Sequence, residues 1–214
     1  MSYSLNNNEM DNRKLAGSIP KHRAGAKSDT SHSKHYKSRE EALAAFQVAK
    51  NKLLNVSKWH DYAGSASADF KLTDRNGNTV TRLAKKGDYF RINIPGPGSE
   101  AGNGYDWVEI IAIKEDFEKE SDTEFIMLQV HPVPDPKNND ESTAHFFKED
   151  ATSTFIVNRK KLIVTAEVHG RNEKPNTNTE NIIDKIRNFF VALGASLGFS
   201  KIQWKSLAVG LIES

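Results

Sequence analysis

The stretch Ile182–Leu197, IIDKIRNFFVALGASL, determines the fold that we expect for this chain. Its apolar residues recur every three or four positions, which places them on one face of an α-helix; they are Ile182, Ile186, Phe189, Phe190, Leu193 and Leu197. Thr177 and Glu180 form a capping box before this helix, and Gly198 favours a left-handed exit after it. Two adjacent phenylalanines need a broad apolar surface, so the helix is predicted to pack on the strand-rich middle of the chain.

The middle of the chain, from Ala68 to Val168, is predicted to form antiparallel strands. Apolar and β-branched segments alternate there with turn signals, of which Asn76-Gly77 and Asn158–Lys161 are typical of hairpins. The expected strands lie at residues 70–72, 89–94, 107–113, 125–130, 152–157 and 162–168. Most of them follow one another as a meander, which favours an α+β architecture over a parallel sheet.

Helices are predicted on both sides of these strands. Ser38 and Glu41 form a capping box, and an apolar stripe then continues to a stop near Asn55. The segment 59–64, WHDYAG, indicates a short helical turn closed by its glycine. After Gly198, Ser200 is expected to cap a last short helix whose inward residues are Ile202, Leu207 and Leu211, with Trp204 beside them.

This order of elements resembles the helix-grip fold of the START-like and polyketide-cyclase-type superfamily. The local likeness lies in KNKLLNVSKWHDYAG (50–64) and in KKGDYFRINIPG (85–96) leading to YDWVEIIAI (105–113), and it covers about residues 39–197. The resemblance implies a curved antiparallel sheet of six or seven strands packed on a long C-terminal helix. The alternative fold is an SH3-like or other small β-barrel with added helices.

The N-terminal residues 1–38 differ in composition from the rest of the chain. They are rich in Asn, Ser, Lys and His, contain no Val or Phe, and carry a net charge of +4 within a chain of net charge +2. Such a composition does not bury enough apolar area to offset the entropy of ordering, so we predict a disordered basic tail. Residues 39–214 are then expected to form a single α+β domain.

Several classes of protein are disfavoured by the sequence. The chain has no cysteine, no apolar run of the roughly 20 residues that a membrane span needs, and no secretory signal, so a cytoplasmic location is expected. The histidines lack metal-site spacing, and the glycine-rich loop 95–104 lacks the ending of a phosphate-binding loop. We therefore predict no metal and no cofactor. The basic tail lacks interleaved aromatic residues, which argues against nucleic acid as a partner.

Five residues are the candidate lining of a cavity between the sheet and the C-terminal helix. Trp59, Trp107 and Phe155 are expected to supply aromatic walls. Arg171 is expected to bind a carboxylate or phosphate, since it lies in the polar segment 169–176 at the end of a strand. His131 is the second polar group, and it would serve catalysis only beside a carboxylate.

The first functional hypothesis is a non-enzymatic or weakly catalytic protein that holds a small hydrophobic or amphipathic molecule in this cavity. The alternative is an interaction module that binds a protein or nucleic-acid partner through its basic tail and protruding loops. A third possibility, a cyclase or hydrolase of the same fold, requires an acid–base pair inside the cavity. The sequence assigns no catalytic residue, ligand identity or oligomeric state.

Overall fold

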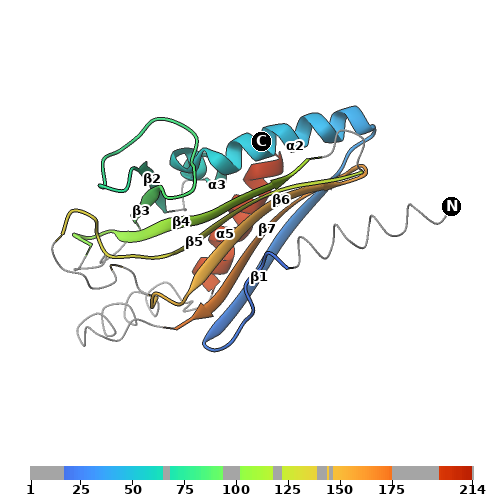
Figure 1. Cartoon of the computed structure of the whole chain (residues 1–214). Helices are drawn as coiled ribbons and strands as arrows, with labels where there is room; N and C mark the ends of the chain where they lie inside the picture. The colour runs from blue at the N-terminus through green and yellow to red at the C-terminus, as the bar shows by residue number, and fades with distance from the viewer. Residues whose placement is uncertain are drawn as a thin grey trace.

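Seven antiparallel strands form one sheet in the computed structural model, which describes residues 17–64, 68–93, 102–117, 122–138, 144, 147–174 and 198–213. The strand order is β1-β7-β6-β5-β4-β3-β2, and Figure 1 shows the long, twisted strands. The strands are β1 Ala26–His35, β2 Asp69–Thr73, β3 Tyr89–Asn93, β4 Asp106–Asp116, β5 Thr123–Pro132, β6 Thr152–Lys160 and β7 Ile163–Glu173. The predicted α+β class is confirmed: a curved antiparallel sheet with a C-terminal helix, not a small barrel.

The helices before β2 follow their sequence signals. α2 spans Arg39–Leu54, and the Ser38 hydroxyl accepts a hydrogen bond from the Glu41 amide at its N-terminus. A short 3-10 helix, η1, spans Val56–Lys58 and leads directly into α3, Trp59–Ala63. Gly64 ends α3 with a φ of 89°, a left-handed value that favours glycine.

The C-terminal helix of the described structure is α5, Gly198–Glu213, which runs behind strands β6 and β7 in the view of Figure 1. Leu207 and Leu211 are buried in it, as predicted. Gly198 is the first described residue of this helix, so its role in ending a preceding helix stays a prediction. The predicted helix Ile182–Leu197 lies outside the described residues. A continuous apolar stripe through Leu207, Ala208, Leu211 and Ile212 explains why α5 packs on the sheet.

The sheet has an inner face, which carries α2, α3 and α5, and an outer face, which carries no helix among the described residues. Side chains alternate between the faces along each strand. On β7, for example, Val164, Ala166 and Val168 belong to the inner core. The main core is inner throughout, and it joins residues of these strands to Ala42, Phe46, Ala49 and Leu53 of α2.

Strand β1 corrects the prediction of a disordered tail, residues 1–38, for residues 26–35; residues 1–16 lie outside the described residues. Its ten residues pair with β7 along an edge of the sheet. They are mostly polar, and within them only Thr30 is buried. Composition misses such a strand because its order comes from backbone hydrogen bonds and polar contacts with neighbouring elements, not from burial of its own apolar side chains.

Contacts with α5 hold β1 from the inner side. Glu213 accepts from Lys34 Nζ at 2.7 Å and lies 2.9 Å from His32 Nε2. Lys205 Nζ donates to the Ser31 carbonyl at 2.7 Å. On its other side α5 approaches α3 so closely that a Cβ at Gly210 would collide with the Tyr62 carbonyl. α5 is therefore wedged between α3 and the β1 edge.

Candidate functional site

On the inner face, a row of polar residues paired across neighbouring strands lies next to a row of mostly apolar ones. These rows are called the polar level and the apolar level. At the polar level Ser153 of β6 pairs with Gly170 of β7, and Gly170 pairs with Ser28 of β1. The apolar level lies two residues along each strand, about 7 Å away. Its members, from β5 to β1, are Leu128, Phe155, Val168 and Thr30. A molecule spanning the two levels would meet polar groups at one end and apolar groups at the other.

Aromatic rings cover the apolar level. Trp59 of α3 lies 4.7 Å from Phe155 between ring centroids, and Trp204 of α5 lies 5.3 Å from the same ring. Phe70 and Phe90 extend the cluster, with centroids 5.3 and 5.8 Å from Trp59. Trp204 is only partly buried, whereas the other four rings are fully buried. The aromatic cluster therefore has one accessible ring, on α5.

A carboxyl group reaches the polar level because β7 is irregular there. Two residues lie between Gly170 and Glu173 on β7, where one residue lies between Ser28 and Ala26 on the paired strand. Asn172 takes a left-handed φ of 56° within this bulge. The bulge turns Glu173 to the inner face, where its carboxyl and the Ser28 hydroxyl fill the space that a Cβ at Gly170 would occupy. Glycine at position 170 thus makes room for the carboxyl.

Glu173 is poorly neutralised in this position. The Glu173 residue is 9% exposed, and its carboxyl accepts a hydrogen bond from Ser28 Oγ at 3.3 Å. Burial raises the pKa of the Glu173 carboxyl, while the Ser28 hydrogen bond and the charge of Arg171 oppose this effect. Within the described residues no ion pair involves this carboxylate, so it has acceptor capacity to spare.

The opposite end of the inner face holds a fully buried ion pair. Arg159 Nε donates to Glu124 Oε2 at 3.0 Å, and both side chains have 0% exposure. Arg159 also donates to the Lys161 carbonyl at 2.8 Å. Because the Glu124 charge is directly paired, this end differs from the Glu173 end of the same face.

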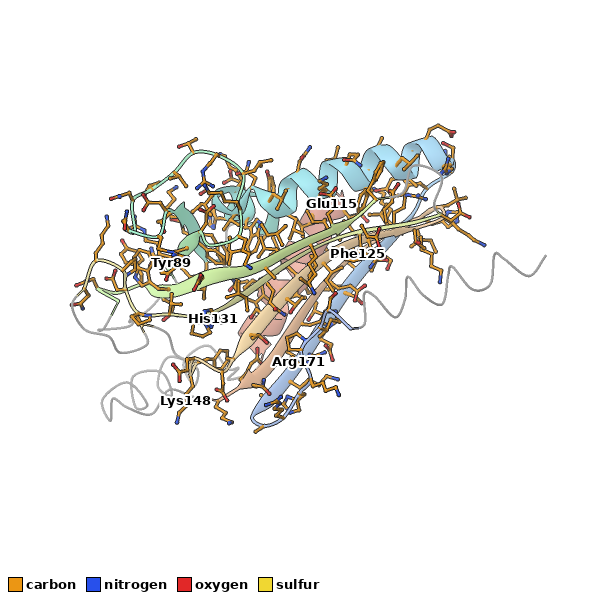
Figure 2. The ribbon with its side chains drawn as sticks, viewed as in Figure 1. Tyr89, Glu115, Phe125, His131, Lys148 and Arg171 are labelled. Carbon is orange, nitrogen blue, oxygen red and sulfur yellow. The ribbon has the colours of Figure 1, made fainter. Side chains whose placement is uncertain are left out.

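The five predicted lining residues divide between the two faces. Trp59 and Phe155 lie on the inner face and touch each other, as a shared lining requires. Trp107, His131 and Arg171 lie on the outer face, as their alternation with the inner residues of β4, β5 and β7 shows. The prediction that all five line one space is therefore corrected for these three. Figure 2 labels His131 and Arg171 on their strands.

Arg171 is occupied by a polar network on the outer face. Its guanidinium donates to the Ser28 and Gly170 carbonyls at 3.0 and 2.7 Å and pairs with Asp29 at 2.7 Å. His169 lies between two carboxylates, with Nδ1 2.6 Å from Asp29 and Nε2 2.9 Å from Glu167. This network ties β1 to β7 and leaves Arg171 buried instead of free to bind a ligand.

The network shifts the pKa of two of its members. Burial disfavours the charged form of His169, but hydrogen bonds to Glu167 and Asp29 outweigh it and raise the pKa of the imidazole. Burial likewise opposes ionisation of Asp29, but hydrogen bonds from His169, Arg171 and Lys27 lower its pKa to about 2. The pair is therefore most stable with His169 protonated and Asp29 ionised.

His131 does have a carboxylate beside it, but on the outer face. Its Nε2 lies 3.4 Å from Glu109 Oε2, and Arg75 lies 3.9 Å from the other oxygen of the same carboxylate. Trp107 packs nearby in a separate small cluster with Val133 and Ala144. This pair lies on the face opposite the aromatic cluster, so it does not supply the acid–base pair that a cavity enzyme would need.

Sequence reasoning missed Glu173 and gave Trp204 only a peripheral role. The polar segment 169–176 contains Glu173, but simple alternation from His169 would place residue 173 on the outer face with Arg171. Only the bulge at Asn172 brings Glu173 to the inner face, and neither Asn172 nor Gly170 is a sequence signal specific enough to predict that bulge.

Within the ranges given above, no group of three or more His, Asp or Glu side chains is arranged to hold a metal ion. In that same part of the chain, no helix is both long and apolar enough to cross a membrane.

Comparisons with known proteins give weak likenesses. No family model matches the chain, and no curated protein matches its sequence. An uncharacterised protein from Bacillus thuringiensis is 12% identical, with a TM-score of 0.37 over 88% of this chain and 100% of the other. Norcoclaurine synthase from Thalictrum flavum is 10% identical, with a TM-score of 0.38 over 89% and 98%. Major latex-like protein 151 from Panax ginseng is 15% identical, with a TM-score of 0.30 over 79% and 96%. At these values no activity transfers to this chain.

Proposed function

We propose that this protein binds a small amphipathic molecule between the inner face of the sheet and α5. The observation that supports the proposal is the adjacency of two levels on that face. One level carries the Glu173 carboxyl with Ser28 and Ser153, and the next carries Phe155 beneath Trp59 and Trp204. Small-molecule sites commonly combine apolar and aromatic walls with a few placed polar groups.

The arrangement also has features that a purely structural core does not need. A packed core gains nothing from a buried carboxylate without an ion-pair partner, because removing such a group from water costs free energy. Here a bulge and a glycine keep Glu173 in that position. Trp204, the partly buried ring of the cluster, contacts Phe155 and Phe70, so it offers a surface against which a ligand would lie.

A thermal-shift screen of the full chain tests the proposal. The compounds are fatty acids, sterols, flavonoids, aromatic polyketides and aryl-alkyl amines. At least one is expected to raise Tm in a concentration-dependent way, since a ligand at a hundredfold excess over its Kd adds about 2.7 kcal/mol of stability.

Two serine variants locate the binding. Ser153→Phe fills the polar level of the inner face and should abolish the shift. Ser33→Phe makes the same change on the exposed outer side of β1 and should leave the shift intact. The absence of any stabilising compound, or equal shifts in both variants, would contradict the proposal.

A further inference from the structure

The ligand of the inner face carries a protonated amine, as we infer from the juxtaposition of the Glu173 carboxylate with the aromatic cluster. The inference rests on the proposed function and names the chemical class of the ligand. The amino group would pair with Glu173, and the apolar body would lie against Trp204, the accessible ring of the aromatic cluster. Three features support the inference: the Glu173 charge that has no counter-ion among the described residues, the direction of the Glu173 carboxyl, and the aromatic rings near it.

The charge balance of the inner face favours a cation. Among the described residues, the other carboxylates whose place on this face is set by contacts have cationic partners: Glu124 pairs with Arg159, Glu213 with Lys34, and Glu115 with Lys50. Glu173 has a hydroxyl partner instead. The charge of Arg171 acts to lower the pKa of Glu173, but Arg171 itself forms its ion pair with Asp29 on the outer face. A neutral or anionic ligand would leave the Glu173 charge unpaired, whereas an ammonium group would supply its missing partner.

The rings favour the same class of ligand. An ammonium group is attracted to a carboxylate and also to the face of an aromatic ring. Among the aromatic side chains, tryptophan binds it most strongly. Phe155 lies one level from the Glu173 carboxyl, which fills the space beside Gly170, and Trp204 packs against Phe155. A carboxylate at one end of an aromatic surface is therefore complementary to an amine that is joined to an apolar body by a short chain.

A matched series of three ligands tests the inference by isothermal titration calorimetry on the full chain. 3-Phenylpropylamine, 3-phenylpropanol and 3-phenylpropanoic acid share one apolar body and differ in the polar end. The amine is expected to bind at least about tenfold more tightly than the alcohol, as one charge-assisted hydrogen bond provides. The acid is expected to bind most weakly.

Glu173→Gln should bring the amine and the alcohol to within about twofold of each other without weakening the alcohol. Glu213→Gln is the matched control, since it makes the same change in a carboxylate that already has partners, and it should keep the amine preference. Equal binding of amine and alcohol to the wild-type protein, or a preference that survives Glu173→Gln, would overturn the amine assignment and leave the proposed function standing. Failure of all three ligands, together with a thermal-shift screen without a hit, would overturn both.

Discussion

The two faces of this sheet treat their charged groups differently. On the outer face, Asp29 and Glu167 are neutralised by His169 and Arg171 within 3 Å. On the inner face, Glu173 is nearly as buried as Arg171 yet has only a hydroxyl partner among the described residues. Neutralised charges join strands, whereas a buried charge without a counter-ion is costly unless something else pairs with it. The difference is consistent with a structural role for the outer network, and it supports the binding that we propose for the inner face.

Removal of β1 is expected to have the largest effect, because this strand contributes to both faces. Deleting residues 1–36 leaves β7 as an edge strand and removes the inner contacts of α5 with Lys34 and Ser31. We predict that cooperative urea unfolding is lost. A deletion of residues 1–16 keeps β1 and serves as the control. A chain without β1 that unfolds cooperatively, within about 1 kcal/mol of the full chain, would show that the strand is dispensable.

Truncation of an inner aromatic ring should come next. Phe155 is 1% exposed and contacts both Trp59 and Trp204, so Phe155→Ala should cost about 3–5 kcal/mol of unfolding free energy. Phe117, which is 49% exposed, is the matched control, and Phe117→Ala should cost less than about 0.5 kcal/mol. Chemical denaturation measures both. Similar losses for the two variants would mean that the aromatic cluster is not the centre of the core.

The outer network should respond to pH in a defined direction. Since the pKa of His169 is raised in the folded state, its contribution is complete below about 6.5 and is lost as the pH rises through the folded value. His169→Gln should therefore cost about 0.5–1 kcal/mol at pH 6 and much less at pH 9. Urea titrations of both proteins at the two values measure the difference. A cost that is the same at both would exclude the imidazolium as the bridging species.

Asp29 sets the lower pH limit at which the same network stabilises the fold. Its pKa is lowered to about 2 in the folded state, so its contribution is present above the usual value of 3.8 and is lost as the pH falls toward 2. Between these limits, from about pH 4 to 6.5, both groups are charged and the network is complete. Asp29→Asn should accordingly reduce stability at pH 5 more than at pH 2, as measured by thermal unfolding.

The smallest effect is expected at the rim of the outer face. Arg75 is 73% exposed and lies 3.9 Å from Glu109, a distance and exposure at which an ion pair contributes little. Arg75→Ala should change the unfolding free energy by less than about 0.5 kcal/mol. A loss well above 1 kcal/mol in a denaturant titration would mean that the cluster around Glu109 and His131 is more than a solvated rim.

The sequence predicted the elements of the fold better than the contacts of the site. Alternation and capping signals identify α2, α3 and most strands, because local periodicity reports which residues are buried. The same logic failed for β1, whose residues pair with residues 128 to 147 positions away in the chain. It also failed for Trp107, His131 and Arg171, because periodicity separates two faces of a strand without saying which face is covered. Glu173 was missed because a single bulge reverses the alternation.

The three tryptophans of the chain provide the most direct test of the central claim, that the inner face binds the ligand. Trp59 and Trp204 lie on that face, and Trp107 lies on the other. The measurement is a ¹⁵N–¹H spectrum of the three indole N–H groups, assigned by single Trp→Phe variants, during titration with the tightest compound of the thermal-shift screen. We predict that the Trp59 and Trp204 resonances shift in a saturable way while Trp107 stays in place. A shift confined to Trp107, or no shift at saturating ligand, would contradict the account.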